Sequence, residues 1–118
     1  MGVTKSSATT IINSQSIGAS ASYTSSGHDV TPAVAAGVDV FLDYSSSPSS
    51  GSVTIEVLGS QDGTNFSDEA LYTAVTTPSG DRRVVFQFNC IGVKYVALKI
   101  SNNTNQSLTA TASIITAM

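Results

Sequence analysis

The sequence predicts an all-β fold, an antiparallel β-sandwich of the jelly-roll type with about eight strands. The first observation is that apolar and polar residues alternate over several separate stretches, as in strands with one buried face. The second is that clusters of Gly, Pro, Asp, Asn and Ser separate these stretches at short intervals. The third is that no stretch shows a sustained helical period. An immunoglobulin-like sandwich is the nearest alternative.

Three weaker segments and several strongly alternating ones make up the predicted strands. The weaker segments run from about residue 9 to 17, 19 to 30 and 66 to 74. In each strong segment, every second side chain is apolar and is expected to face a core between two sheets. The expected inward rows are Val38, Val40, Leu42 and Tyr44; Val53, Ile55 and Val57; Val84, Phe86 and Phe88; Val96, Leu98 and Ile100; and Leu108, Ala110, Ala112 and Ile114.

The links between these strands have the chemistry of turns. They span residues 45–51, 61–65, 77–81 and 102–105. In the second link Gly63 follows Asp62, and this glycine is expected to adopt a positive φ. The segment 31–37, which contains Pro32, is predicted to be a crossing loop or one short helical turn. A crossover of this kind between two sheets favours the jelly roll.

Length and composition predict one domain with a surface of low charge. The 118 residues suit a single domain over residues 1–118, with residues 1–8 as an extended N-terminal arm. Hydrophobic residues make up 41% of the chain, which is enough for a core, whereas charged residues make up only 11%. An ordinary soluble domain has about 25% charged residues. Ser, Thr and Asn take their place, and a surface of this kind suits close packing against neighbouring molecules.

The charge pattern argues against nucleic acid and membrane as partners. The net charge is −3, and Arg82 and Arg83 are the only adjacent basic residues, whereas phosphate binding needs a basic stripe. No segment approaches the ~20 apolar residues that cross a membrane. The N-terminus lacks the apolar stretch of a signal peptide, so synthesis in the cytoplasm without export is expected. Cys90 is the single cysteine, which precludes an internal disulfide and predicts a buried thiol.

No group of residues indicates catalysis, a metal site or a cofactor, and we predict that the protein is not an enzyme. His28 is the single histidine and is expected to lie exposed in a turn. Asp39 and Asp43 are expected on the outward face of one strand with Glu56 on the next, as a solvated acidic face rather than a glycosidase pair. The Asp-Gly loop offers oxygen atoms but lacks the spacing of a calcium-binding loop.

Outward-facing apolar residues predict an interaction surface. Phe41, Leu58, Val85 and Tyr95 fall on the outward rows of their strands, where apolar side chains indicate a patch that is covered in an assembly. The alternative use of such residues is stacking against sugar rings. For that role the candidates are Tyr23, Phe41 and Tyr95.

Two stretches resemble a known type of module. The segment 51–66, GSVTIEVLGSQDGTNF, resembles the hairpin of discoidin-like jelly-roll modules, and the segment 92–100, GVKYVALKI, resembles one of their later strands. Similar combinations occur in small proteins of tailed bacteriophages and prophages. Phe66 stands where a Trp is usual and Ala97 where an Arg is common. The cysteines that brace secreted discoidin domains are missing, which argues against a secreted, membrane- or sugar-binding version.

This resemblance implies a structural protein of a bacteriophage virion. The expected role is that of a capsid decoration or cement protein on the outer head surface, made in the host cytoplasm. Its partners would be the major capsid protein or other virion proteins, and a homo-oligomer such as a trimer at a local symmetry axis is expected. One alternative is a carbohydrate-binding module on a tail tip or fibre. Another is a neck or tail component.

Overall fold

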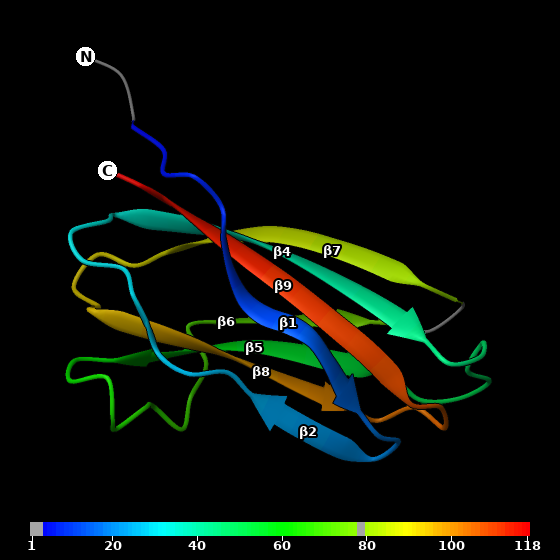
Figure 1. Ribbon diagram of the computed structural model, residues 1–118. Helices are drawn as coiled ribbons and strands as arrows, with labels where there is room; N and C mark the ends of the chain where they lie inside the picture. The colour runs from blue at the N-terminus through cyan, green and yellow to red at the C-terminus, as the bar shows by residue number, and fades with distance from the viewer. Residues whose placement is uncertain (1–3, 78–79) are drawn as a thin grey trace.

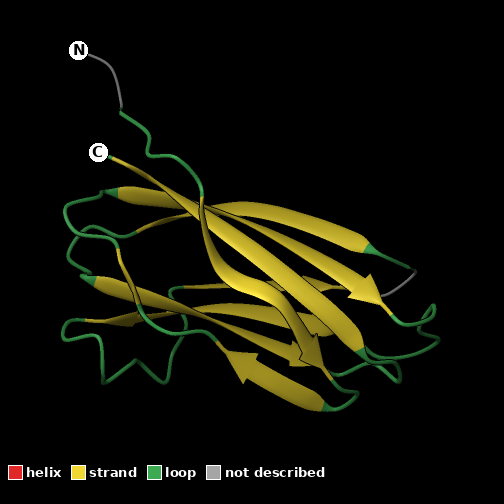
Figure 2. Ribbon diagram, viewed as in Figure 1, coloured by secondary structure: helices red, strands yellow, loops and turns green. Residues whose placement is uncertain are grey.

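The computed structural model describes residues 4–77 and 80–118, and within them it contains strands and loops but no helix (Figures 1 and 2). It follows that no helix in these residues has the length and apolar character of a membrane span. The strands are β1 (Thr9–Ile17), β2 (Ala21–Thr24), β3 (His28–Asp29), β4 (Ala35–Tyr44), β5 (Val53–Ser60), β6 (Tyr72–Thr76), β7 (Arg82–Asn89), β8 (Tyr95–Asn102) and β9 (Leu108–Ala117).

The strands form two antiparallel sheets that face each other (Figure 1). Sheet A has the order β1-β9-β4-β7, and sheet B has the order β2-β8-β5-β6, with the short β3 also paired to β8. With β3 set aside, the first strand pairs with the last, the second with the second-last, and so on inward to β5 and β6. This nested pairing defines a jelly roll. The predicted all-β, antiparallel jelly-roll sandwich is therefore confirmed.

The core lies between the sheets and is built mainly from the predicted inward rows. Of these residues only Val84 is half-buried, and the others are buried. One side of the sandwich, where β6 and β7 are the edge strands, is closed by an aromatic pair. The rings of Tyr72 and Phe86 stack there with their centroids 4.8 Å apart. Alternation thus identified most of the core, because the strongly alternating strands bury one face only. It did not identify the buried residues Ile12, Ile17, Val30, Ala33 and Ala36.

The weaker segments gave mixed results. The 9–17 segment is β1, as predicted, but the 19–30 segment divides into β2 and β3. The strand predicted over 66–74 is wrong over most of its length, because residues 61–71 form a loop and β6 begins only at Tyr72. The apolar residues of 66–71 do not alternate, which explains the failure. The segment 31–37 is a loop as far as residue 34 and forms no helical turn, and β4 begins at Ala35.

The two ends of the sandwich differ in the loops they carry. The loops 30–34, 61–71 and 90–94 lie at one end, which we call the groove end, and the C-terminus lies near it (Figure 1). The loops 18–20, 45–52 and 103–107 lie at the opposite end, which we call the polar end. Residues 4–8 of the expected N-terminal arm run beside the end of β9. There the amide of Ser6 donates to the carbonyl of Thr116 at 2.9 Å.

Candidate interaction surfaces

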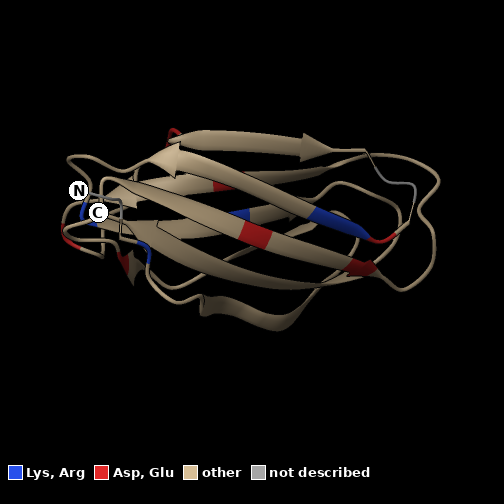
Figure 3. Ribbon diagram, turned by 90° about the horizontal axis from the view of Figure 1, so that it is seen from above, with Lys and Arg blue, Asp and Glu red and all other residues tan. Residues whose placement is uncertain are grey.

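The outer face of sheet A carries two of the predicted interaction residues, Phe41 and Val85. The guanidinium of Arg83 lies 5.1 Å from the centre of the half-buried Phe41 ring. Nη1 of Arg83 also donates to Oδ1 of Asp39 at 2.8 Å. Val85 stands opposite Asp39 in the β4–β7 register and is 68% exposed. These four residues, the sheet A patch, form a neutral and partly apolar surface on a face that carries few charges (Figure 3).

A shallow hollow continues the sheet A patch toward the chain termini. Gly37 contributes no side chain to the outer face, and Ala8, Ser113 and Ile115 border the space that it leaves. The volume of the hollow is about 270 Å³. Most side chains around this hollow are therefore uncharged, and charged residues are also depleted at the centres of many protein interfaces.

Leu58 and Tyr95, the other two predicted residues, lie on the outer face of sheet B. This face is partly covered by the chain itself, because the 61–71 loop folds across it (Figure 1). A Cβ atom on Gly63 would lie 3.5 Å from the Tyr95 ring, and one on Gly27 would lie 2.8 Å from the tip of the Phe66 ring. The four predicted residues thus divide into two pairs on opposite faces, and they do not form one surface.

Each aromatic ring considered for sugar stacking has a neighbour within the chain. Tyr23 on β2 is half-buried and packs against the core. Tyr95 faces the turn at Gly63, and Phe41 lies under the Arg83 guanidinium. A ring that stacks on a sugar needs one open face. These three rings are far apart on the sandwich, so they do not form a common platform.

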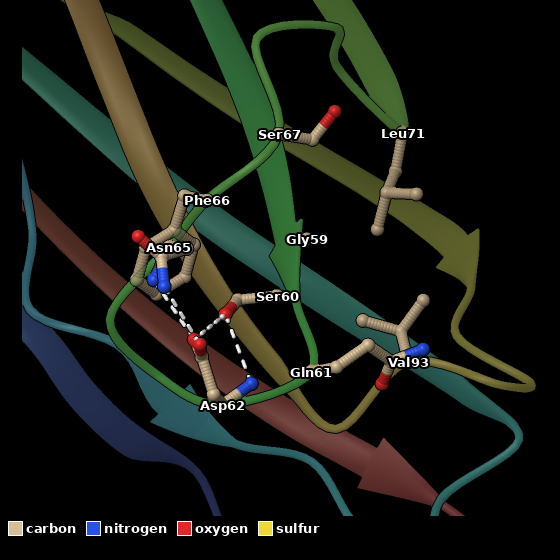
Figure 4. A pocket seen from close by; sticks show the side chains of 9 residues that line it. All are labelled: Gly59, Ser60, Gln61, Asp62, Asn65, Phe66, Ser67, Leu71 and Val93. Atoms are coloured by element: carbon tan, nitrogen blue, oxygen red, sulfur yellow. Dashed lines mark hydrogen bonds between the residues drawn. The ribbon is translucent and has the colours of Figure 1, made fainter.

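The turn after β5 is organised by the carboxylate of Asp62 (Figure 4). Its Oδ1 accepts bonds from the amides of Thr64 and Asn65, both at 2.8 Å, and from Oγ of Ser60 at 3.0 Å. Its Oδ2 accepts a bond from Nδ2 of Asn65 at 2.8 Å. The backbone amide of Asn65, followed by that of Thr64, holds the pKa of Asp62 well below its ordinary range. Asp62 is therefore engaged in shaping the turn, and Gly63 has the predicted positive φ of 79°.

Two hollows flank Gln61 at the groove end. The first, of about 490 Å³, lies beside Phe66, Leu71 and Val93 (Figure 4). The second, of about 480 Å³, lies between the 31–34 and 91–94 loops. Nε2 of Gln61 donates to the carbonyl of Gly92 at 2.6 Å, which places this side chain between the two hollows. The groove end therefore has apolar walls, with polar groups at the point where the hollows meet.

Several chemical candidates occupy positions that differ from expectation. His28 is half-buried in β3, opposite Val96, and does not lie exposed in a turn. Asp39 and Asp43 are on sheet A whereas Glu56 is on sheet B, so the expectation of neighbouring strands is wrong. The reason is that consecutive strands in a jelly roll often belong to opposite sheets. Within residues 4–77 and 80–118 no three His, Cys, Asp or Glu residues form a metal-binding group.

The predicted burial of Cys90 is confirmed. Its side chain is fully buried, and its Sγ lies 3.6 Å from the carbonyl oxygen of Ala33. Burial raises the pKa of the Cys90 thiol above its ordinary value, and a hydrogen bond with the Cys90 backbone opposes this increase by a smaller amount. A thiol that is both buried and held in its neutral form is a poor nucleophile.

The sequence reasoning missed some exposed apolar residues. Val34 and Ile91 border the second hollow with 45% and 67% of their surface exposed, and Leu71 lines the first. Val75 on β6 is 65% exposed. Val34, Leu71 and Ile91 lie in loops, where no alternation marks an outward row. Val75 belongs to a strand whose bounds were predicted incorrectly, so its face was not assigned.

No protein-family model matches the sequence, and no curated protein matches it significantly. Solved structures do share the fold. The SPBc2 prophage-derived protein YomS superposes with a TM-score of 0.55 and 13% sequence identity, over 98% of this chain and 96% of that one. A structure described as "CBM4 structure and function" superposes with a TM-score of 0.51 and 6% identity, over 82% of this chain and 61% of that one. At these identities the likeness establishes the β-sandwich fold.

Proposed function

We propose that this protein is a structural component of bacteriophage particles, and specifically a capsid decoration protein that binds the outer surface of the head. The observation that carries the proposal is the end-to-end likeness to a prophage-derived protein, which covers 98% of this chain and 96% of the other. The β-sandwich accounts for nearly the whole of both chains, so the similarity extends beyond a shared insert or subdomain. In this proposal the protein binds and does not catalyse.

The sheet A patch is the docking surface in this proposal. It is neutral because Arg83 pairs with Asp39, and it includes Val85, which is 68% exposed. Desolvating a neutral apolar patch costs less than desolvating unpaired charges, so the patch can be buried against the major capsid protein. Many copies, arranged as homo-oligomers on the repeating capsid lattice, would add modest contacts at each site and gain strength through multivalency.

The location can be tested by immunogold labelling of intact particles from a lysate in which this protein is expressed. We expect gold over the heads. Gold confined to the neck, tail or fibres would contradict decoration and would support a neck or tail component. Protein found only in the free fraction, with unlabelled particles, would overturn the placement in the virion.

The docking face can be tested with a matched pair of substitutions, Val85→Asp and Val75→Asp. Both valines lie on edge strands with similar exposure, 68% and 65%, but on opposite sheets. We expect Val85→Asp to lose binding to particles that lack the protein, whereas Val75→Asp binds like the wild type. The reverse result would move the docking surface to sheet B.

A carbohydrate-binding module is the second candidate, and the groove end is the observation that favours it. Phe66 lines a hollow there together with the polar side chains of Gln61 and Asn65, and a CBM4 structure shares the fold. A glycan array with the wild type, Gln61→Ala and Phe41→Ala tests this candidate. If a sugar binds at the groove end, Phe41→Ala should give the same array signal as the wild type, and Gln61→Ala should lose it. An array without signal would remove the candidate.

A further inference from the structure

The outer edge of β7 presents a row of backbone groups that no other strand of residues 4–77 and 80–118 uses. β7 is the last strand of sheet A in the described part of the chain. The amide of Cys90 donates to the carbonyl of Val34 at 3.0 Å. These two residues follow the pair Ala35 and Asn89 in the β4–β7 register, so they form a hydrogen-bonded pair of the ladder. Bonded pairs recur at every second residue of an antiparallel ladder. The amides and carbonyls of Val84, Phe86 and Phe88 therefore face β4, and those of Arg83, Val85 and Gln87 face the open edge.

The other described edges have features that discourage pairing with another chain. β1 contains two register shifts against β9, and Ser14 within it has a positive φ of 49°. β2 has four residues and β6 has five. Irregular or short edge strands are common means by which proteins prevent unwanted strand pairing. β7 is different, because its eight residues pair with β4 without a register shift.

The composition of β7 also favours pairing. Residues 84–89 read VVFQFN, with no charge and no proline. Segments with high β-propensity, low charge and an open edge associate readily with other strands. Val85, in the middle of this stretch, is the most exposed of the large hydrophobic residues described. We infer that this edge is covered when the protein performs its function.

The shape of the sandwich indicates what can cover the edge. In the view onto sheet A, β6 of sheet B extends beyond β7 (Figure 3). If a second copy brought its own β7 alongside, its projecting β6 would collide with sheet B of the first. A single extended segment avoids this collision. It would lie along β7 and above β6, with its inward side chains beside Tyr72 and Phe86, whose rings already stack there.

We propose that an extended polypeptide segment of the phage particle adds to sheet A as a further strand along β7. This inference rests on the proposed virion role and specifies how the contact is made. The segment should carry apolar residues on its inward row, and a β-branched residue opposite Val85. It should not carry Lys or Arg opposite Arg83, because like charges directly opposite each other destabilise a strand pair.

Amide hydrogen exchange, measured on the free protein and on the protein bound to particles, tests this proposal. We expect exchange at Val85 and Gln87 to slow by about tenfold or more on binding, because their edge-facing amides become hydrogen-bonded. The amides of Val84, Phe86 and Phe88 are bonded to β4 in both states and serve as internal controls. Binding without slower exchange at Val85 and Gln87 would overturn the strand addition and leave the virion role intact.

Two other outcomes would also overturn the proposal. Slower exchange at Val85 and Gln87 in the isolated protein, increasing with its concentration, would identify a second copy as the occupant of the edge. Failure to bind particles would overturn the strand addition together with the virion role.

Proline substitutions give an independent test. Val85→Pro removes an amide that faces the open edge and leaves the bonds to β4 in place, and proline is tolerated at such edge positions. Val75→Pro is the matched control. The amide of Asn103 donates to the carbonyl of Ser52, so the even-numbered residues of β5 form their backbone bonds with β8 and the odd-numbered ones with β6. Val75 lies opposite the even-numbered Thr54 in the β5–β6 register. Its amide therefore points away from β5, toward an open edge.

We expect Val85→Pro to weaken particle binding by about tenfold or more and Val75→Pro to leave it unchanged. Circular dichroism and melting curves will establish that both variants fold. Equal binding by two folded variants would contradict the proposal.

Discussion

The loops at the two ends of the sandwich differ in how they are held in place. At the polar end, side chains bond the loops to one another. Nδ2 of the fully buried Asn102 donates to the carbonyls of Ile17, Gly18 and Gln106, and its Oδ1 accepts from both the amide and the hydroxyl of Thr104. Two connections, the one after β1 and the one after β8, therefore meet at one amide side chain. The 45–52 loop is joined to the 103–107 loop by further side-chain bonds, such as that from Nδ2 of Asn105 to Oγ of Ser49 at 2.8 Å.

At the groove end, the loops leave apolar surface uncovered. Gln61 joins the 61–71 loop to the β7–β8 loop by one bond, and Ile91 beside it is 67% exposed. The comparison indicates that the polar end stabilises the fold, whereas the groove end and the sheet A face are available for contact with other molecules. Substitutions at the polar end should therefore cost more stability than substitutions at the groove end.

The largest effect is expected for Gly51→Ala at the polar end. Gly51 has a φ of 89°, and a Cβ atom there would lie only 1.9 Å from the carbonyl oxygen of Asn103. We expect the free energy of unfolding to fall by about 4 kcal/mol or more, since two backbone segments must separate. Urea denaturation measures this change.

Gly92→Ala, at the groove end, is the control for Gly51→Ala. Its φ of 82° is similar, but beyond the two adjacent residues no described atom lies within 4 Å of the added Cβ. This variant should lose only about 1 kcal/mol, the cost of the left-handed conformation. Equal losses in the two variants would show that the contact with Asn103 is unimportant.

The second-largest loss of stability is expected for Asn102→Ala. The substitution removes the side chain that joins the connections after β1 and β8. It takes away the amide donor of the Ile17 carbonyl and the acceptor of the Thr104 amide. Each such loss costs about 1–3 kcal/mol, and relaxation of the loops should limit the total to about 3 kcal/mol. Thermal melting compared with Asn103→Ala, the exposed neighbour, isolates the role of the buried amide. Similar melting temperatures for the two variants would refute a closing role for Asn102.

The sequence was sufficient to predict most of the core but not the surfaces. Burial alternates with a period of two over most of β4, β5, β7 and β9. Inward residues such as Val40 and Ile55 can therefore be identified without knowledge of the partner strands. The pairing of strands is a long-range property. Asp39 and Arg83 are 44 residues apart and meet only because β7 pairs with β4. The outward position of Phe41 could therefore be predicted, but its cover by Arg83 could not.

The groove end was still less predictable. Its walls come from three separate loops, and no local pattern specifies how these loops approach one another. The turn chemistry of Asp62 and Gly63 was visible in the sequence because the bonds of this turn are local. The packing of Gly63 on Tyr95 depends on the register of β5 and β8, which is set by the whole sheet.

A smaller effect is expected for Gly63→Val at the groove end. Gly63 has a φ of 79°, but a Cβ atom would meet the Tyr95 ring at 3.5 Å, an ordinary contact distance. The main cost is the positive φ for a β-branched residue, and we expect a loss of about 1–2 kcal/mol. Thr64→Val places the same side chain one residue later and should change the melting temperature little. A loss as large as that of Gly51→Ala would contradict the contrast between the two ends.

The smallest effect is expected for Asp62→Asn, and it should depend on pH. The backbone amides lower the pKa of Asp62 in the folded state, so the ionised carboxylate contributes stability above the unfolded pKa of about 4. This contribution is lost as the pH falls below about 4 toward the folded pKa. Asp62→Asn should therefore melt below the wild type at pH 7, and the difference should shrink in acid. Asp68→Asn, a change to an exposed carboxylate of the same loop, is the control. A difference between Asp62→Asn and wild type that stays constant from pH 7 to strongly acidic solution would show that the charge of Asp62 does not stabilise the turn.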